Sequence, residues 1–419
     1  MVIVLETQLL IRLGDLVLKG RNIGTFLKLV HANIKAAMDG LEFRTEARHN
    51  RIYLKVRTED RAEAESRLSR IPGVHSFAEI RVTSPDKESV TTTAAELMDS
   101  TLDKDGYRFK IETKRVDKTY PMTSQDISRA FSGVILPMAK RRVEVDVNDP
   151  EVVLHIEIRK HEAYVFLEAT KGMGGFPLGI AGKGAVMMSG GIDSAVAAYL
   201  SMKQGIDVEL VHFESTPMTP LESAQKVIDL ARVLSRYRPD QTMTIRFVPF
   251  YDIHKAILDM VPKPYTITVM RRMMYRITEM VAKTSRMLCL INGESVGQVA
   301  SQTLESMKTV NAVVSYPVIR PLVTYDKEDI IRIARKIGTF DISVRPFEDC
   351  CSIYVPKSPA TKPMAMYARR YEGLFDHEAL IGKAMEDIRI VKVSHREPFD
   401  LTAAGLTLSD ALDTLGGDV

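Results

Sequence analysis

The chain has 419 residues, of which 45% are hydrophobic, and a formal net charge of +3. This length predicts two or three domains with a substantial core, and no uncharged apolar run reaches the roughly 18 residues of a membrane span. The N-terminus lacks a signal-peptide pattern and three cysteines are too few for a disulfide framework, so we expect a cytoplasmic protein rather than a membrane or secreted one.

The positive charge is concentrated in the N-terminal half. Residues 12–57 carry a net charge of +6 and residues 105–142 carry +5, whereas the remainder carries −8. This asymmetry favours a polyphosphate partner on the N-terminal half and separate chemistry on the other. Ordinary solvated basic faces give the same pattern, so charge alone leaves both interpretations open.

The first elements form a small unit of alternating strand and helix. "TQLLIRLGDLVLKG" predicts a strand, an amphipathic helix follows and ends at Gly40, and Arg51–Val56 alternates like a strand. We predict a first domain over residues 1–61. Helices and strands continue to alternate over residues 62–170 and end in the hairpin-like "EVVLHIEIRKHEAYVFLEAT", which indicates an α+β module.

Residues 171–184 contain six glycines, which favours a flexible connection or a ligand-facing loop. Beyond it, the short apolar runs "AVMM", "VELVHF", "TIRFVPF" and "MLCLIN" alternate with helical segments of ten or more residues. This alternation predicts an α/β domain over residues 171–395, with a parallel sheet that binds its ligand at the carboxyl ends of the strands. Residues 396–419 are predicted to be a tail of uncertain order.

The turn "SGGIDS", Ser189 to Ser194, directly follows the first of these strands. Its glycines let the backbone approach a bulky group, and the helix beginning near Ser194 directs free N–H groups at the same point, so we predict a phosphate site. No Gly-Lys-Ser/Thr ending follows, which excludes a Walker A loop. A plain strand-to-helix turn capped by Asp193 is the alternative.

The turn resembles the pyrophosphate loop of the ATP pyrophosphatases, and five further segments resemble the tRNA 4-thiouridine synthetase (tRNA sulfurtransferase) family in the same order. These segments are "GDLVLKGRNIGTF", "FKIETKRVDKTYPMTSQDISRAFSGVIL", "INGESVGQVASQTLESM", "RPLVTYDKEDIIRIARKIGT" and "EDCCSIYVPKSPATKP". The resemblance covers about residues 5–395. It implies a ferredoxin-like domain, a THUMP RNA-binding domain and a PP-loop ATP pyrophosphatase domain of the adenine nucleotide alpha hydrolase type.

The resemblance also implies an activity. Such an enzyme adenylates the carbonyl oxygen of a uridine at position eight of tRNA with ATP and Mg²⁺, and sulfur then displaces AMP to give 4-thiouridine. Asp193 is suited to hold the magnesium ion on the pyrophosphate. Hydrogen bonds to the pyrophosphate are expected from Ser189, Gly190, Gly191 and Ser194.

Seven more residues match positions that line the nucleotide pocket in this family. They are Met187, Met188, His212, Phe213, Arg271, Gly293 and Gln302. Core packing is the alternative for the two methionines and the His212-Phe213 pair, because each pair ends a predicted buried strand. A solvated basic face that includes Arg272 is the alternative for Arg271.

Two further residues are matched to catalytic roles. Lys327 is suited to steady phosphate charge or the substrate, although a plain lysine at a helix start gives the same pattern. Cys350 matches the family cysteine that handles sulfur. Cys351 could carry, resolve or merely neighbour that sulfur, whereas Cys289 lies in "MLCLIN" and is predicted to be structural.

Longer family members carry a rhodanese-like domain whose cysteine delivers a persulfide. No cysteine follows Cys351 in this sequence, so we expect sulfur to arrive on a separate protein, such as a cysteine desulfurase or a stand-alone rhodanese. The family's second role in thiamine synthesis, which is associated with that domain, stays open. A homodimer is the assembly that the resemblance suggests.

The two basic windows supply the candidate tRNA contacts. These are Lys19, Arg21, Lys114, Arg115, Lys118, Lys140, Arg141 and Arg142, each of which solvation alone would also explain. Three rival functions are kept open: an ammonia-dependent ligase on the same loop, a non-catalytic tRNA-binding protein, and a THUMP-carrying methyltransferase. The last is disfavoured because the C-terminal half lacks a glycine-rich cofactor fingerprint after its first strand.

Overall fold

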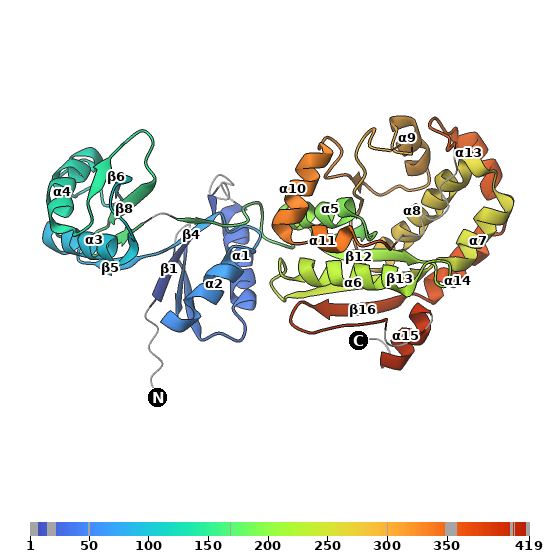
Figure 1. Cartoon of the computed structure of the whole chain (residues 1–419), viewed down its shortest axis with the longest axis horizontal. Coiled ribbons are helices and arrows are strands. Elements are labelled where there is room, and N and C mark those ends of the chain that lie inside the picture. Colours follow the sequence, from blue (N-terminus) through green and yellow to red (C-terminus); the bar gives the residue numbers. More distant parts are fainter. Residues whose placement is uncertain are drawn as a thin grey trace. The chain divides into compact units, whose positions relative to one another are not determined.

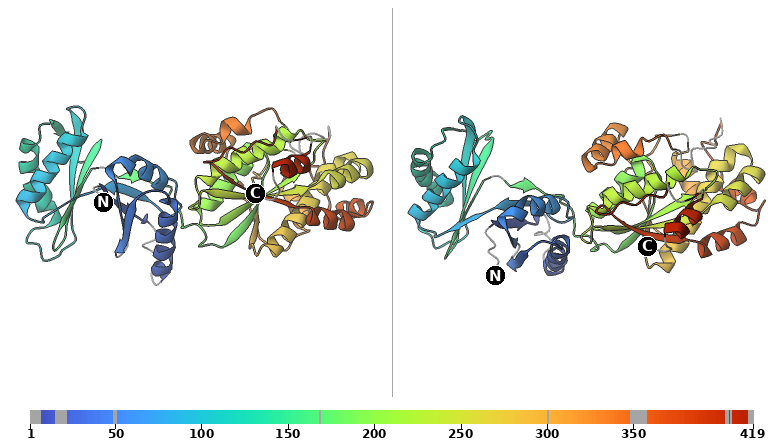
Figure 2. Two further views of the ribbon diagram at one scale, coloured as in Figure 1. Left: turned by 90° about the horizontal axis from the view of Figure 1, so that it is seen from below. Right: turned by 60° about the horizontal axis from the view of Figure 1, so that its bottom comes forward.

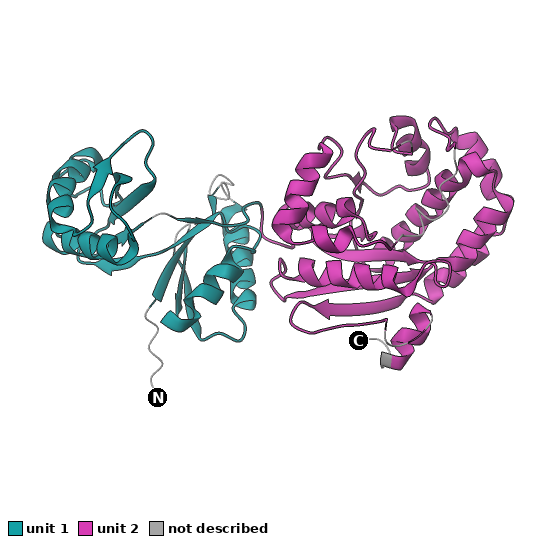
Figure 3. Ribbon diagram, in the orientation of Figure 1, with its two compact units in different colours: residues 1–175 teal, residues 176–419 magenta. Residues whose placement is uncertain are grey.

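The computed structural model describes residues 7–14, 22–48, 51–167, 169–299, 301–347, 358–402, 405 and 407–415. The chain divides into two compact units, residues 1–175 and residues 176–419 (Figure 3). Four candidate residues lie outside the described ones: Lys19, Arg21, Cys350 and Cys351. Within the described ranges, no helix combines the length and apolarity needed to cross a membrane.

The first sheet of unit 1 has the strand order β10-β4-β1-β3-β2, and every neighbouring pair is antiparallel. Its elements are β1 (Thr7–Arg12), α1 (Ile23–Ala37), β2 (Phe43–Arg48), β3 (Arg51–Val56), the short 3₁₀ helix η2 (Thr58–Asp60), α2 (Arg61–Leu68), β4 (Ser76–Glu79) and β10 (Thr170–Lys171). The predicted helix and the strand at residues 51–56 are both present, and Gly40 follows α1 with a φ of +81°, a left-handed conformation that suits glycine at a helix end.

The boundary of the first module differs from the expected residue 61. Strand β4 lies beyond that point, yet it pairs with β1, where Ala78 lies opposite Leu10. The segment "VHSFAEIRVT" was expected to be one strand, and it divides instead into β4 of the first sheet and β5 (Arg81–Thr83) of the second. The division depends on pairing with strands that are distant in the sequence, since β4 pairs with β1 and β5 pairs with β9. Local periodicity therefore does not reveal it.

The second sheet of unit 1 has the order β5-β9-β8-β6-β7. Its further elements are α3 (Lys87–Thr101), β6 (Tyr107–Arg115), α4 (Ser124–Met138), β7 (Val143–Val145), β8 (Val152–Ile158) and β9 (Ala163–Phe166). Figure 1 labels strands β5, β6 and β8 of this sheet together with helices α3 and α4. The predicted hairpin is confirmed, since β8 and β9 pair antiparallel. Helices α3 and α4 bury Val90 and Phe131 against Phe109 of β6, which forms the core of this module.

The described basic candidates lie at two ends of β6. Lys114 and Lys118 are exposed at its carboxyl end. The second group precedes β7, which pairs in parallel with the amino end of β6. It consists of Lys140 and Arg142, which are exposed, and Arg141, which is half-buried. Arg115 has a structural role, because its guanidinium donates hydrogen bonds to the carbonyls of Tyr120 and Met122.

Unit 2 contains a six-stranded sheet with the order β15-β14-β11-β12-β13-β16. The strands are β11 (Lys183–Met187), β12 (Asp207–Glu214), β13 (Thr242–Pro249), β14 (Cys289–Ile291), β15 (Val318–Ile319) and β16 (Arg389–Ser394). All neighbouring pairs are parallel except β13 and β16, so the predicted parallel sheet of four apolar strands is confirmed and extended at both edges.

Helices cover both faces of this sheet (Figure 2). They are α5 (Ile192–Lys203), α6 (Leu221–Ser235), α7 (Tyr251–Met260), η3 (Lys263–Tyr265), α8 (Thr266–Thr284), α9 (Leu304–Asn311), α10 (Lys327–Ile337), α11 (Phe340–Ser343), α13 (Ala365–Glu372), α14 (His377–Glu386) and α15 (Leu408–Leu415). Helices α5 and α6 pack on one face, and α7, α8 and α14 pack on the other.

Described parts of the predicted tail pack against unit 2. Leu401 and Leu408 are both buried. The Leu401 N–H donates to Gln225 Oε1 at 2.8 Å, and the Leu408 N–H donates to Thr216 Oγ1 at 3.2 Å. Helix α15, which the sequence did not indicate, follows from Leu408.

The Glu279 carboxyl on α8 fixes the loop before β15. It accepts hydrogen bonds from the backbone N–H groups of Ser315 and Tyr316, from the Ser315 hydroxyl and from Lys283. Burial alone would raise the pKa of Glu279, but these four donors outweigh it and lower the pKa to about 2.

Glu279→Gln is therefore expected to destabilise the protein at pH 7 by about 2 kcal/mol. Because the pKa is lower in the folded state, the stabilisation from Glu279 is fully present above about pH 4.5 and is lost as the pH falls toward 2. Urea unfolding of both proteins between pH 3 and pH 7 measures this, and the gap between them should narrow as the pH falls. A gap that stays constant with pH would contradict this account.

Candidate functional site

The predicted turn lies at the carboxyl end of β11, at the edge where the other parallel strands also end. Met187 closes the strand, Ser189 to Gly191 form the bend, and α5 begins at Ile192. The bend is ordered by hydroxyl groups, since Ser194 Oγ lies 2.9 Å from the Ser189 carbonyl and the Gly191 N–H donates to Ser189 Oγ at 3.2 Å. This geometry leaves the first turn of α5 beside the bend, where its N–H groups favour an anion.

A cavity of about 560 Å³ opens at this bend. Among the described residues it is lined by Met187, Met188, Ser189, Gly191, Asp193, Ser194, His212, Phe213, Ile267, Arg271, Met274, Tyr275, Asn292, Gly293, Glu294, Val299, Ser301, Gln302 and Pro359. The sequence-predicted pocket residues are thus brought together, with Gly190 alone absent from the lining. Their roles in binding a nucleotide stay predictions.

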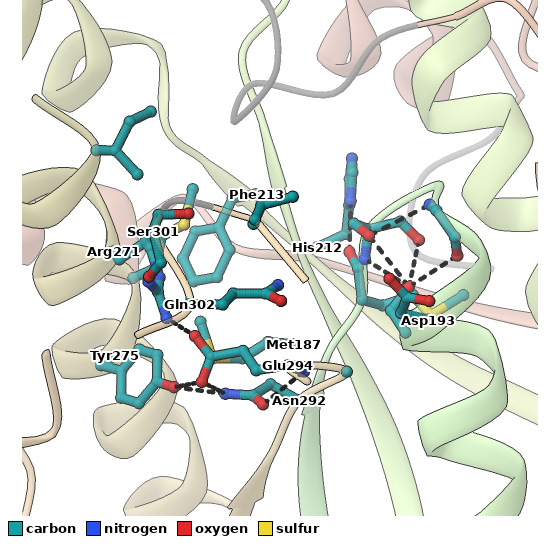
Figure 4. Close-up of a pocket in the computed structure, with 18 of the residues that line it drawn as sticks. Met187, Asp193, His212, Phe213, Arg271, Tyr275, Asn292, Glu294, Ser301 and Gln302 are labelled. Atoms are coloured by element: carbon teal, nitrogen blue, oxygen red, sulfur yellow. Dashed lines mark hydrogen bonds and ion pairs between the residues drawn. The ribbon is translucent and has the colours of Figure 1, made fainter. Parts of the chain in front are cut away.

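The cavity is polar at both ends and has apolar side chains between them. Asp193 lies at one end, Arg271 and Glu294 lie at the other, and Phe213 lies between (Figure 4). The size and the division suit a nucleotide, because an apolar slot accepts a base while N–H and hydroxyl groups accept phosphates.

Asp193 is the acidic side chain at the end of the cavity next to the bend. Lys327 Nζ lies 2.6 Å from Asp193 Oδ1, and Gln298 Nε2 donates to Asp193 Oδ2 at 2.9 Å. Lys327 is the first residue of α10, so it is a helix-start lysine, as the alternative interpretation expected. Its ammonium group nevertheless contacts Asp193 in the site. No cluster of three His, Cys, Asp or Glu side chains suited to a metal occurs in the described ranges.

His212 and Gly293 fix the backbone around the bend. The ring of His212 is buried, and its Nδ1 lies 2.9 Å from the Met188 carbonyl, so it braces the end of β11. A methyl group on Gly293 would lie 2.6 Å from the carbonyl carbon of Asp193 and 2.7 Å from the Ser194 nitrogen, which shows how closely the loop after β14 approaches the bend.

Arg271 belongs to a buried polar network at the far end of the cavity. It pairs with Glu294 and donates to the Ser301 carbonyl at 2.7 Å, while Glu294 also accepts from Arg320 and from the Tyr275 hydroxyl (Figure 4). Burial raises the pKa of Tyr275, which keeps its hydroxyl protonated as a donor. The solvated-face interpretation of Arg271 is wrong, because both Arg271 and Arg272 are largely enclosed, with 12% and 1% of their side chains exposed.

Sequence reasoning missed eight of the described lining residues, and also Gln298, which contacts Asp193. Asn292 and Glu294 directly follow β14, so their position after a strand was a usable signal. Tyr275 and Gln298 gave none, because the first lies within an apolar helix and the second in a loop whose path depends on the fold.

Comparison with known proteins confirms the resemblance over nearly the whole chain. Profiles described as ThiI ferredoxin-like domain, THUMP domain and Thiamine biosynthesis protein (ThiI) match residues 8–78, 85–168 and 179–376. A probable tRNA sulfurtransferase of Acholeplasma laidlawii (strain PG-8A) is 46% identical over 410 residues, which cover 98% of this chain and 99% of that protein. The chain belongs to the ThiI family.

Solved structures agree with membership of the ThiI family. The crystal structure of a 4-thiouridine synthetase in complex with RNA and bound ATP has a TM-score of 0.84 and 30% identity, and the match covers 93% of this chain and all of that one. The protein PH1313 from Pyrococcus horikoshii shares the fold, with a TM-score of 0.62 and 22% identity over 80% of this chain and all of that one. The expected ferredoxin-like, THUMP and PP-loop architecture is therefore confirmed.

Proposed function

We propose that this protein is an ATP-dependent tRNA sulfurtransferase that forms 4-thiouridine from the uridine at position eight. The observation that carries the proposal is the cavity at the Ser189–Ser194 bend, since all but one of the nucleotide-pocket residues expected for such an enzyme line it. The similarity to a 4-thiouridine synthetase crystallised with RNA and ATP supports the same substrates.

In this proposal the base of ATP lies against Met187 and Phe213, and the β- and γ-phosphates lie at the bend. The uridine oxygen attacks the α-phosphorus, and the bond to pyrophosphate breaks. Adenylation makes the uridine oxygen a leaving group, so the terminal sulfur of a persulfide can attack the adjacent carbon, the C–O bond breaks and AMP departs. A second cysteine thiol then attacks the remaining S–S bond, which forms a disulfide and releases the thiocarbonyl. Lys327 stabilises the phosphate charge that develops in the first step.

Asp193 is the residue proposed to hold magnesium. A single carboxylate fits this ion, because Mg²⁺ is commonly bound by one or two carboxylates together with substrate phosphates. The carboxylate is 23% exposed and lies beside the bend, where phosphate oxygens would complete the coordination. Bound there, the ion would neutralise charge on the phosphates, while Gln298 orients the second carboxylate oxygen.

Cys350 is proposed to handle the sulfur. Cys289, which lies within the described residues, is unsuited to carry sulfur because it is buried in β14. Burial raises the pKa of its thiol, so Cys289 forms little reactive thiolate. Pro359, nine residues after Cys350 in the chain, lines the cavity. The proposed sulfur donor is a separate persulfide-carrying protein, either a cysteine desulfurase or a rhodanese. Cys351 either carries the sulfur, resolves the persulfide or only neighbours Cys350.

The tRNA is proposed to contact the basic residues of unit 1, with Lys114 and Lys118 at one end of β6 and Lys140, Arg141 and Arg142 at the other. These two groups are separated by a nine-residue strand, about 25–30 Å long, so they would contact different phosphates. A homodimer and a cytoplasmic location complete the proposal, the latter because the substrate tRNA is found there.

The test combines tRNA lacking the modification, ATP, Mg²⁺ and a persulfide donor. The wild-type protein should release AMP and pyrophosphate and should form 4-thiouridine, detected by mass spectrometry of nucleosides. Cys350→Ser should lose the thiolated product, whereas Cys289→Ser should keep it. An ammonia-dependent ligase would be insensitive to Cys350→Ser, and a protein that only binds tRNA would release no AMP; either result would overturn the proposal.

A further inference from the structure

Helix α13 and its flanks present exposed aromatic and basic side chains. We name this region the α13 surface; it consists of Lys263, Lys362, Met366, Tyr367, Arg369 and Arg370. Tyr367 is 39% exposed and Met366 is 63% exposed, so α13 presents large apolar side chains beside its basic ones. None of the chemistry assigned to the cavity uses them.

The α13 surface is rigidly supported from beneath. The opposite side of α13 buries Ala368 and Glu372, and Glu372 accepts hydrogen bonds from both Arg272 and Arg276 on α8. The ring of Tyr367 lies nearly parallel to that of Tyr371, with centroids 6.4 Å apart, and Tyr265 packs edge-on against both. The exposed tyrosine is therefore held in one orientation, as a platform for a planar group requires.

The α13 surface is connected to the cavity wall through the chain and through hydrogen bonds. Pro359 lines the cavity, and the next residue, Ala360, donates its N–H to the Pro264 carbonyl at 2.9 Å. Four residues on, the Met364 N–H donates to the Tyr265 hydroxyl at 3.2 Å. Tyr265 directly precedes α8, whose first turn carries Ile267 of the cavity wall. A strand of nucleic acid that entered the cavity along this segment would pass the α13 surface.

The charge of the segment favours a polyanion. Residues 358–374 contain Lys362, Arg369 and Arg370, and their acidic member, Glu372, is buried and bound by two arginines. Lys362 Nζ lies 3.8 Å from a carboxylate oxygen of Glu305, which is half exposed. Arg369 and Arg370 are both exposed, and within the described residues they have no ion pair, so they are suited to contact phosphate groups.

We propose that the α13 surface binds the RNA strand next to the uridine that enters the cavity, with a base stacked on Tyr367 and phosphates on Arg369 and Arg370. The inference rests on the proposed function, because it requires a tRNA substrate. It adds a contact on the catalytic unit that is separate from the basic residues of unit 1.

The test measures the KM for tRNA, the KM for ATP and tRNA affinity by fluorescence anisotropy. Tyr367→Leu should weaken tRNA binding roughly 5- to 100-fold, as expected for one lost base stack, while Tyr367→Phe should bind like wild type. The double variant Arg369→Ala/Arg370→Ala should reduce the slope of log affinity against log salt by about 1.4, which corresponds to two single-strand phosphate contacts. The KM for ATP should not change in either variant.

Arg236→Ala, an exposed arginine at the end of α6, is the matched control and should leave the salt slope unchanged. Unchanged tRNA affinity in both α13 variants would overturn the inference. So would variants that are slow with a persulfide donor protein yet normal with inorganic sulfide, because the surface would then bind that protein. If the wild type forms no 4-thiouridine, the proposed function fails, while the anisotropy still decides whether RNA binds here.

Discussion

Gly293→Ala is expected to lower kcat/KM for ATP by about 100-fold or more while the protein stays folded. The added methyl group would lie 2.6–2.8 Å from backbone atoms of Asp193 and Ser194, which cannot rotate away as a flexible side chain would. Either the loop after β14 or the first turn of α5 must shift. Since the bend and Asp193 lie at that point, the phosphate site changes shape even though the substitution is small.

The measurement is ATP affinity by calorimetry together with AMP release in the presence of tRNA. Gly382→Ala is the matched control, because this glycine lies in helix α14 with no atom within 4 Å of the added methyl group. That variant should retain activity and gain up to about 1 kcal/mol of stability. Wild-type ATP affinity in Gly293→Ala would mean that the bend tolerates displacement, and the close packing of these two loops would have no functional role.

The catalytic unit could be predicted from the sequence because its signals are local. Four apolar runs alternate with helices, and the bend after the first run carries glycines and serines in a recognisable order, so strands, helices and site edge follow from neighbouring residues. The cavity then forms because parallel strands end together, which brings Met187, His212 and Gly293 to one place from distant parts of the chain.

Features decided by distant contacts could not be predicted. Arg271 and Arg272 are adjacent, and a step of about 100° around α8 directs the first to the cavity and the second into the core. Gln298 reaches Asp193 across 105 positions of the chain. The split between β4 and β5 depends likewise on pairing partners, because either segment is an ordinary short strand by composition.

Glu372→Ala is expected to destabilise unit 2 by about 3–5 kcal/mol, because it leaves buried Arg272 without its counter-charge. Burial by itself raises the pKa of Glu372, but hydrogen bonds from Arg272 and Arg276 lower it below the ordinary value, so the carboxylate stays charged. Urea unfolding measures the loss, and Asp252→Ala, which breaks the exposed Lys383 pair, should change little. Because Glu372 joins α13 to α8, a stable Glu372→Ala protein with unaltered tRNA affinity would show that neither helix depends on this pair.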